Sequence, residues 1–349
     1  LDQAIYGWRQ ADVANILNFE KQYPDAKVVV LEENYRSTQN ILSAANMIIS
    51  KNKMRKEKNL FTKNIAGEKL SVVVAATETE EAEFVARTIR TLARDKHFSL
   101  SDIAVLYRTN AQSRAVEEIF ARRALAYKVV GGLKFYERKE IKDVLAYIRC
   151  VANPRDTVSL KRIINFPPRG IGKVSLTNFF QKKETTKAID EFFALIASLK
   201  EERAALPFSS FMKLVIQRSG IKDHFKELGE KEETRWENVR ELISAAAAYD
   251  AETPEQALTS FLDNAALASQ ESKEESKGAV HVMTMHSAKG LEFRAVFVIG
   301  MEDNIFPHSR SKQSPADMEE ERRLCYVAIT RAKEHVWLLY ARSRRTYGK

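Results

Sequence analysis

Two arginines of the sequence lie where an anion would be expected to bind. Arg36 comes just before the predicted start of a helix whose N-cap is Ser37 or Thr38, so its charge faces the positive end of the helix dipole. That placement is unfavourable by about a few tenths of a kcal/mol unless a negative group compensates it. The compensating group is either Glu32 or Glu33, in a local salt bridge, or a phosphate of a bound ligand.

The second arginine, Arg331, belongs to a segment, residues 319–333, in which acidic residues come first and basic residues last. The helix dipole favours this order, so we predict a helix. Leu324, Val327, Ala328 and Arg331 then share one face, which puts the guanidinium on the apolar side of the helix. A charge there needs a partner, either a buried structural ion pair or a phosphoryl group that the arginine contacts as an arginine finger.

A polar segment between two predicted strands carries a third set of candidate ligands. Thr284, His286, Ser287 and Lys289 follow a strand end, where they could bind phosphates, and Glu292 could accept a hydrogen bond from a ribose hydroxyl. Polar loops between strands are common, so this segment alone is a weak signal. Near the start of the chain, aromatic and basic residues could stack on the bases of single-stranded nucleic acid, or could simply be core residues: Tyr6, Trp8 and Arg9.

Two segments imitate parts of an ATP-hydrolysis site without having its chemistry. Residues 169–173 resemble the end of a phosphate-binding P-loop, but Pro167 occupies the first glycine position and Val174 the hydroxyl position. Residues 28–33 form an apolar run that ends in acids, as in a Walker B metal site, but no aspartate heads the acidic pair. The sequence therefore contains neither a Walker A nor a Walker B motif.

The elements that must position these residues alternate between short apolar runs and helical patterns, which is typical of a parallel sheet covered by helices. Predicted strands are residues 27–31, 70–75, 102–107, 127–130, 281–285, 295–300 and 336–340. Helical patterns separate the early strands at residues 38–50, 80–94 and 111–124. From about residue 135 to 278 helical patterns dominate, for example at residues 138–151, 208–218 and 233–249. We predict an α/β domain with a helical insertion, and Gly131-Gly132 as a hinge.

Composition limits the class of protein and its partners. The 349 residues include 56 Lys and Arg against 47 Asp and Glu, and the net charge of +9 weakly favours a polyanionic partner. The 18 Phe and 11 Tyr exclude a disordered chain, and no apolar run is long enough to span a membrane. Two cysteines suggest a reducing, cytoplasmic compartment, and the six histidines have no metal-ligand spacing, so we expect no metal site.

Taken together and in this order, the motifs resemble those of the UvrD/PcrA/Rep family of superfamily 1 DNA helicases. Residues 2–9 resemble family motif III, residues 33–38 motif IV, residues 284–293 motif V and residues 327–332 motif VI. Residues 105–110 and 131–136 resemble further family signatures. One departure is Gln10, which stands where the family usually has glycine.

The resemblance implies two RecA-like motor domains, of which this chain would supply the edge of the first (residues 1–30) and the second (residues 31–134 and 279–349). Residues 135–278 would be the inserted helical accessory domain. Gln3, Arg36 and Arg331 would contact the γ-phosphate of ATP, Tyr35 would stack on adenine, and Glu292 would bind the ribose. The single-strand track and a duplex-contacting loop would be formed by Tyr6, Trp8, Arg9, Thr284, His286, Arg169, Gly170 and Gly172.

The implied activity is ATP-dependent unwinding of DNA, with 3′ to 5′ travel along one strand. ATP would act with Mg²⁺, whose ligands we expect in the first motor domain, and repair or replication proteins would be partners. Because the chain begins within motif III and lacks both Walker motifs, we expect a fragment that is inactive alone. The alternatives are a DNA-binding or regulatory module that grips duplex DNA or a partner protein, and a helicase–nuclease subunit of the RecB type.

Overall fold

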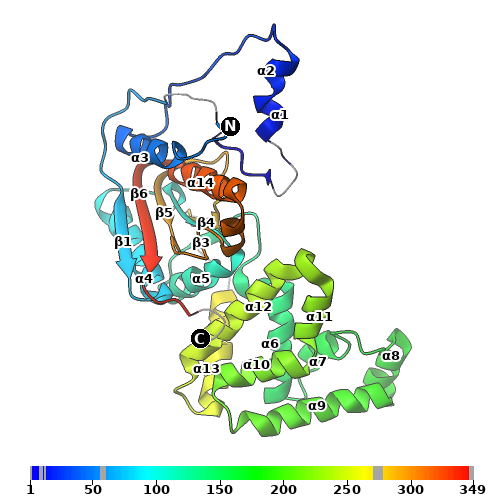
Figure 1. The fold of residues 1–349 in the computed structure, drawn as a ribbon. Coiled ribbons are helices and arrows are strands. Elements are labelled where there is room, and N and C mark those ends of the chain that lie inside the picture. The colour runs from blue at the N-terminus through cyan, green and yellow to red at the C-terminus, as the bar shows by residue number, and fades with distance from the viewer. Residues whose placement is uncertain (1, 8–10, 12, 56–59, 270–277, 346–349) are drawn as a thin grey trace. The chain divides into compact units, whose positions relative to one another are not determined.

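The computed structural model describes residues 2–7, 11, 13–55, 60–269 and 278–345 (Figure 1). The chain divides into two compact units. The first, here called the sheet unit, contains the described residues up to Gly132 and those from Gly278 to Arg344. The second, here called the helical unit, begins at Leu133 and contains the described residues up to Ser269. No helix in the described ranges is long and apolar enough to cross a membrane.

A six-stranded sheet, in which every pairing is parallel, organises the sheet unit. Its strand order is β1-β6-β5-β2-β4-β3. The strands are β1 (Ser71–Ala75), β2 (Ile103–Tyr107), β3 (Tyr127–Val129), β4 (Val280–Thr284), β5 (Phe293–Val298) and β6 (Ala332–Ala341). The predicted α/β class with a parallel sheet is confirmed. The helical unit is inserted between β3 and β4, which are neighbours in the sheet.

Helices cover both faces of the sheet, as its buried strands require. On one face, α3 (Gln39–Ile49) and α14 (Pro315–Ile329) pack side by side (Figure 1). On the other face lie α4 (Glu78–Asp95) and α5 (Ser113–Arg122). The sequence of α4 explains its orientation, because its apolar residues recur at helical spacing on the buried face, where Glu78 and Glu81 are the charged residues that join them. Two short helices, α1 (Val13–Leu17) and α2 (Phe19–Gln22), precede this layer.

The helical unit is built around buried aromatic and aliphatic side chains, among them Tyr147, Phe192, Phe211 and Phe261. Its helices are α6 (Lys139–Ala152), α7 (Thr157–Ile163), α8 (Lys173–Lys182), α9 (Lys187–Arg203), α10 (Phe208–Arg218), α11 (Ile221–Leu228), α12 (Glu233–Ala246) and α13 (Pro254–Ser269). The predicted helical character of this stretch is therefore confirmed. The further assignment of the two units to a second motor domain and an accessory domain remains a prediction.

A buried ion network fastens the carboxyl end of β6 to the rest of the sheet unit. Arg344 donates to Glu81 at 2.5 Å and to Glu302 at 2.7 Å, and its side chain is 11% exposed. The two carboxylates also accept backbone N–H groups, Glu81 from Gly300 at 2.9 Å and Glu302 from Ala341 at 2.8 Å. Every charge in this network thus has a partner, which is the condition for keeping charges inside a protein.

One predicted strand is wrong. Residues 27–31 are not a strand, and the side chains of Val29 and Leu31 are 72% and 83% exposed. A strand needs a neighbour to accept and donate its ladder hydrogen bonds, and no described residue pairs with this run. Its apolar composition is a real β signal, but a composition signal cannot supply the missing neighbour.

Candidate functional site

Arg331 lies in the short connection between α14 and β6, not on the helix as predicted. The helix ends at Ile329, and Thr330 closes it by donating its hydroxyl to the carbonyl of Tyr326 at 2.8 Å. Such bonds from a β-branched residue compete with helix continuation. The strand then starts at Ala332, so Arg331 is buried by the turn that joins two elements.

The Arg331 guanidinium is buried, and no described carboxylate pairs with it. Only 2% of the residue is exposed, and its nitrogens donate to the carbonyls of Val327 and Leu291, both at 3.1 Å. Within the described ranges it forms no ion pair, so the structural ion pair that the sequence left open is not found there. Burial, followed by the nearby Arg36, lowers the pKa of Arg331 to about 10. A buried cation of this kind is costly and favours the arrival of an anion.

Arg36 is paired, but with a residue far away in the sequence. Its Nε donates to Oε2 of Glu292 at 2.9 Å and its Nη1 to the carbonyl of Thr330 at 3.3 Å. The local salt bridge to Glu33 does not form, because Glu33 is engaged by Lys63 at 3.0 Å and by the hydroxyl of Tyr35 at 2.9 Å. The structure therefore brings Arg36, Glu292 and Arg331 together from three separate motifs.

Lys333 completes this group, and the sequence analysis missed it. Its Nζ lies 2.7 Å from Oε1 of Glu292, so each oxygen of that carboxylate has its own cation. The hydrogen bond from Lys333, and then that from Arg36, lower the pKa of Glu292 to about 2. Positions 331 and 333 had been assigned to a helix, whereas an extended segment puts alternate side chains on the same side. We call Arg36, Glu292, Arg331 and Lys333 the cation cluster.

The N-terminus of α3 adjoins the cation cluster, but the N–H groups of its first residues, 38–40, already have partners. Thr38 donates its N–H to the carbonyl of Lys333 at 3.2 Å, Gln39 to Ile65 at 3.1 Å and Asn40 to Ala66 at 3.1 Å. Most anion sites at helix ends use these N–H groups. An anion at the cation cluster would therefore be held by side chains.

The low pKa of Glu292 makes the stability of the fold depend on pH. A carboxylate whose folded pKa is depressed stabilises the fold above its unfolded pKa, and this contribution is lost as the pH falls towards 2. We expect the side-chain ¹³C resonance of Glu292 to titrate near pH 2, and Lys333→Met to move this pKa up towards 4.5. Lys63→Met, which removes a comparable partner from Glu33, is the control and should leave Glu292 unchanged. An unshifted Glu292 titration in Lys333→Met would contradict the pairing.

A second group of candidates lies at the carboxyl ends of the strands, whereas the cation cluster lies near their amino ends. Thr284 ends β4, and its hydroxyl bonds the hydroxyl of Ser287 at 2.9 Å and accepts the N–H of Ser287 at 3.2 Å. Gly131, whose φ is +78°, comes so close that a Cβ there would lie 3.1 Å from the Ser287 hydroxyl. His286 is half-buried in the same loop. Residues 285–292 then run back along the sheet to the amino end of β5. This length of chain separates the group from the cation cluster.

The start of the chain packs against this region of the sheet unit. Ile5 is buried, Gly7 donates its N–H to Glu320 of α14 at 3.1 Å, and Arg323 donates to the carbonyl of Ala4 at 2.9 Å. Lys289 lies 4.7 Å from the ring centre of Tyr6, which links the first motif to the loop after β4. Gln3 is exposed, and no hydrogen bond joins it to Arg36 or Arg331 in the described structure. Trp8, Arg9 and Gln10 lie outside the described residues.

In the helical unit, Arg169 points inward. Its Nη2 donates to the hydroxyl of Tyr147 at 2.6 Å and to the carbonyl of Ser219 at 2.8 Å, and its Nη1 to the carbonyl of Pro167 at 3.0 Å. Gly170, with φ of +71°, and Gly172 are exposed, and the space beside each is open. The side chain of Arg169 therefore holds the loop, and the two glycines form its outer surface.

The similarity of this chain to known proteins extends over the segments that contain these residues. Residues 29–343 match the family described as UvrD-like helicase C-terminal domain. A protein of Staphylococcus aureus (strain MRSA252) named ATP-dependent DNA helicase PcrA is 45% identical over 379 aligned positions, covering 100% of this chain and 51% of that protein. One of the same name from Staphylococcus epidermidis (strain ATCC 35984) is 44% identical over 375 positions, with the same two coverages. The chain thus spans about half the length of these relatives.

Proposed function

Because the chain belongs to the UvrD-like helicase family, we propose that it supplies the second motor unit of an ATP-dependent DNA helicase. The observation that carries this proposal is Arg331, a buried guanidinium with no carboxylate partner among the described residues. Arg36 and Lys333 pair with the carboxylate of Glu292, so the cation cluster holds three cations and one carboxylate. Such an excess of positive charge suits a polyanion, and the triphosphate of ATP is one.

The family motifs assign each side chain of the site a contact with the nucleotide. Arg36 and Arg331 would bind the γ-phosphate, Glu292 the ribose, and Tyr35, whose ring is largely exposed, the adenine. Nucleotide binding would then exchange partners, because Arg36 would leave the Glu292 carboxylate for the phosphate. Lys333 would keep Glu292 in place during this exchange, since it holds the other carboxylate oxygen.

The remaining nucleotide contacts would come from elsewhere. Gln3 would sense the γ-phosphate from the first motor domain, to which we assign residues 1–30. Mg²⁺ would accompany the nucleotide, with its ligands in that domain. The described ranges contain no group of three or more His, Cys, Asp or Glu that could hold a metal ion.

DNA would bind to other surfaces of the same chain. Tyr6, Trp8, Arg9, Thr284 and His286 would line the single-strand track, where aromatic side chains stack on bases. The exposed backbone of Gly170 and Gly172 would approach a duplex phosphate closely, because neither has a side chain to prevent it. Closing of the nucleotide cleft on ATP and its reopening after hydrolysis would move the track along one strand, in the 3′ to 5′ direction.

The test measures ATP turnover with and without a first motor domain. We expect the 349-residue chain alone to show no DNA-stimulated hydrolysis, because it lacks both Walker motifs. Joined to the first motor domain of a family member, it should hydrolyse ATP and unwind a duplex with a 3′ single-stranded tail. Steady ATP turnover by the chain alone would contradict our expectation that hydrolysis needs the first motor domain. A joined protein that folds but does not hydrolyse ATP would contradict the proposal itself.

A further inference from the structure

The outer edge of the sheet at β1 is open. β1 is the terminal strand of the sheet, it pairs with β6 on its inner side, and no described residue pairs with its outer side. Two of its five residues expose apolar side chains, Val72 at 67% and Val74 at 43%. An apolar strand edge of this kind is a ready template for another strand, and proteins usually cover or charge it.

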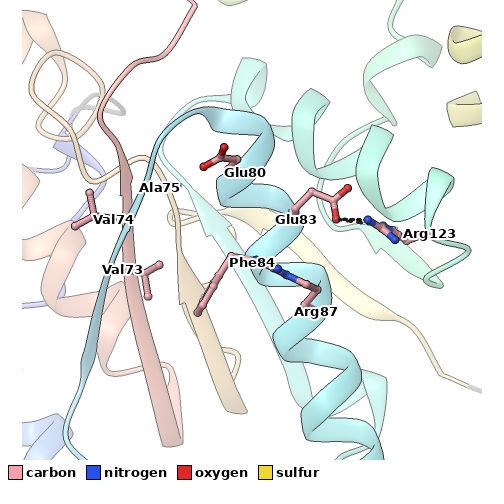
Figure 2. A pocket seen from close by; sticks show the side chains of 8 residues that line it. All are labelled: Val73, Val74, Ala75, Glu80, Glu83, Phe84, Arg87 and Arg123. Carbon is pink, nitrogen blue, oxygen red and sulfur yellow. Dashed lines mark hydrogen bonds and ion pairs between the residues drawn. The ribbon is translucent and has the colours of Figure 1, made fainter.

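A cavity runs along the same edge between β1 and α4. It has a volume of about 510 Å³, and Figure 2 shows Val73 on the strand facing Phe84 and Arg87 on the helix. An added strand would place alternate side chains in this cavity and the others beside Val72 and Val74. The edge and the cavity therefore form one surface, which we call the β1 edge.

The charges of α4 identify the occupant. The glutamates of α4 occupy its first half and the arginines its second. Val85 lies midway in the sequence between Glu80 and Arg90, and also midway between Glu83 and Arg87. A second copy of α4 that runs antiparallel would thus set Glu80 and Glu83 of one helix opposite Arg90 and Arg87 of the other. A two-fold interface requires this self-complementarity.

The centre of β1 and the centre of the charge pattern on α4 lie at the same level, so one two-fold axis could pass beside both. Val73 is the central residue of β1, and it lies level with Phe84 and Arg87, next to the centre of the charge pattern (Figure 2). An axis perpendicular to the sheet at this level would pair β1 with β1 of a second copy in antiparallel orientation. The same axis would bring the exposed Val72 and Val74 side chains of the two copies into contact on the opposite face.

The charged side chains have bonding capacity left for a partner. Arg87 forms no hydrogen bond or ion pair with any described residue, and Glu83 uses one oxygen, Oε2, for Arg123 at 3.0 Å. We propose that the β1 edge is the interface of a two-fold symmetric dimer, in which two sheets join through β1 and Arg87 pairs with Glu83 of the second copy. This proposal does not depend on the nucleotide site.

The experiment is sedimentation velocity of the 349-residue chain over a concentration series. We expect a dimer that Val72→Lys with Val74→Lys converts to a monomer, whereas Val158→Lys, at an exposed valine of the helical unit, has no effect. Arg87→Glu should raise the dissociation constant of the dimer by about tenfold or more, because the new carboxylate would face the carboxylate of Glu83 in the second copy. Adding Glu83→Arg to that variant should restore it, since the charges then match again.

Three results would overturn the proposal. A chain that stays monomeric at the highest soluble concentration would leave the edge to a strand of another protein. A dimer that persists with both lysines would use a different surface. Failure of Glu83→Arg to rescue Arg87→Glu, in variants with unchanged circular dichroism, would remove the antiparallel α4 pairing.

Discussion

In the chain joined to a first motor domain, we expect Arg331→Ala to lower kcat for ATP hydrolysis by about 10³–10⁵-fold, the range found for arginine fingers. The reason is positional, because the turn after α14 buries this guanidinium and gives it two carbonyl partners but no carboxylate from the part of the chain that the structure describes. A charge held in this way is available to the charge that develops on a transferring phosphoryl group. Arg331→Lys should recover little, since an ammonium cannot keep both carbonyl contacts while reaching a phosphate.

Loss of the fold would imitate this result, so the control is a buried arginine with a purely structural role. Arg344 is paired with Glu81 and Glu302, which makes Arg344→Lys a matched substitution. We expect it to lower the melting temperature and to leave kcat per folded molecule unchanged. If Arg331→Lys instead lowers the melting temperature and keeps a normal kcat, Arg331 has a structural role only.

The second large effect concerns the helical unit. Arg169→Ala removes bonds to Tyr147, Ser219 and Pro167, and we expect it to destabilise this unit by about 2–4 kcal/mol because buried carbonyls lose their donor. Duplex affinity should fall with the fold of the loop, since the positions of Gly170 and Gly172 depend on it. Thermal unfolding of the full chain, followed together with duplex binding over a salt series, measures both effects.

A direct phosphate contact would behave differently. Lys173 is exposed at the start of α8, and Lys173→Ala should reduce the slope of log affinity against log salt by about one without changing the melting temperature. If Arg169→Ala shows this same behaviour, with unchanged stability, its side chain contacts DNA and our assignment of it to the loop interior is wrong.

The sequence predicted best those elements whose signal is local. The helical pattern at residues 208–218 gives the bounds of α10, because apolar residues at helical spacing and the preceding proline mark both the face and the start. Residues 27–31 carry an equally clear apolar run, but strand formation depends on a neighbour that no local pattern reveals.

The cation cluster shows the same limit for a site. Motif resemblance selected Arg36, Glu292 and Arg331, yet the bond between Arg36 and Glu292 joins residues 256 positions apart, and no spacing rule predicts it. Lys333 was missed because the helix was extended past Thr330. The helix ends at Ile329 with Thr330 as its C-cap, and this end changes which side chains share a face.

The insertion of the helical unit between β3 and β4 has a mechanical consequence. The chain leaves the sheet through Gly131, where a Cβ would lie 3.1 Å from the Ser287 hydroxyl, and returns through β4, which ends at Thr284, the residue bonded to Ser287. The exit connection therefore passes beside the loop that follows β4, and the return connection enters the sheet at Val280, about 16 Å along β4 from that loop. The loop that we propose for the DNA track is thus joined to the insertion directly through β4, whereas the cation cluster lies on other elements of the sheet unit.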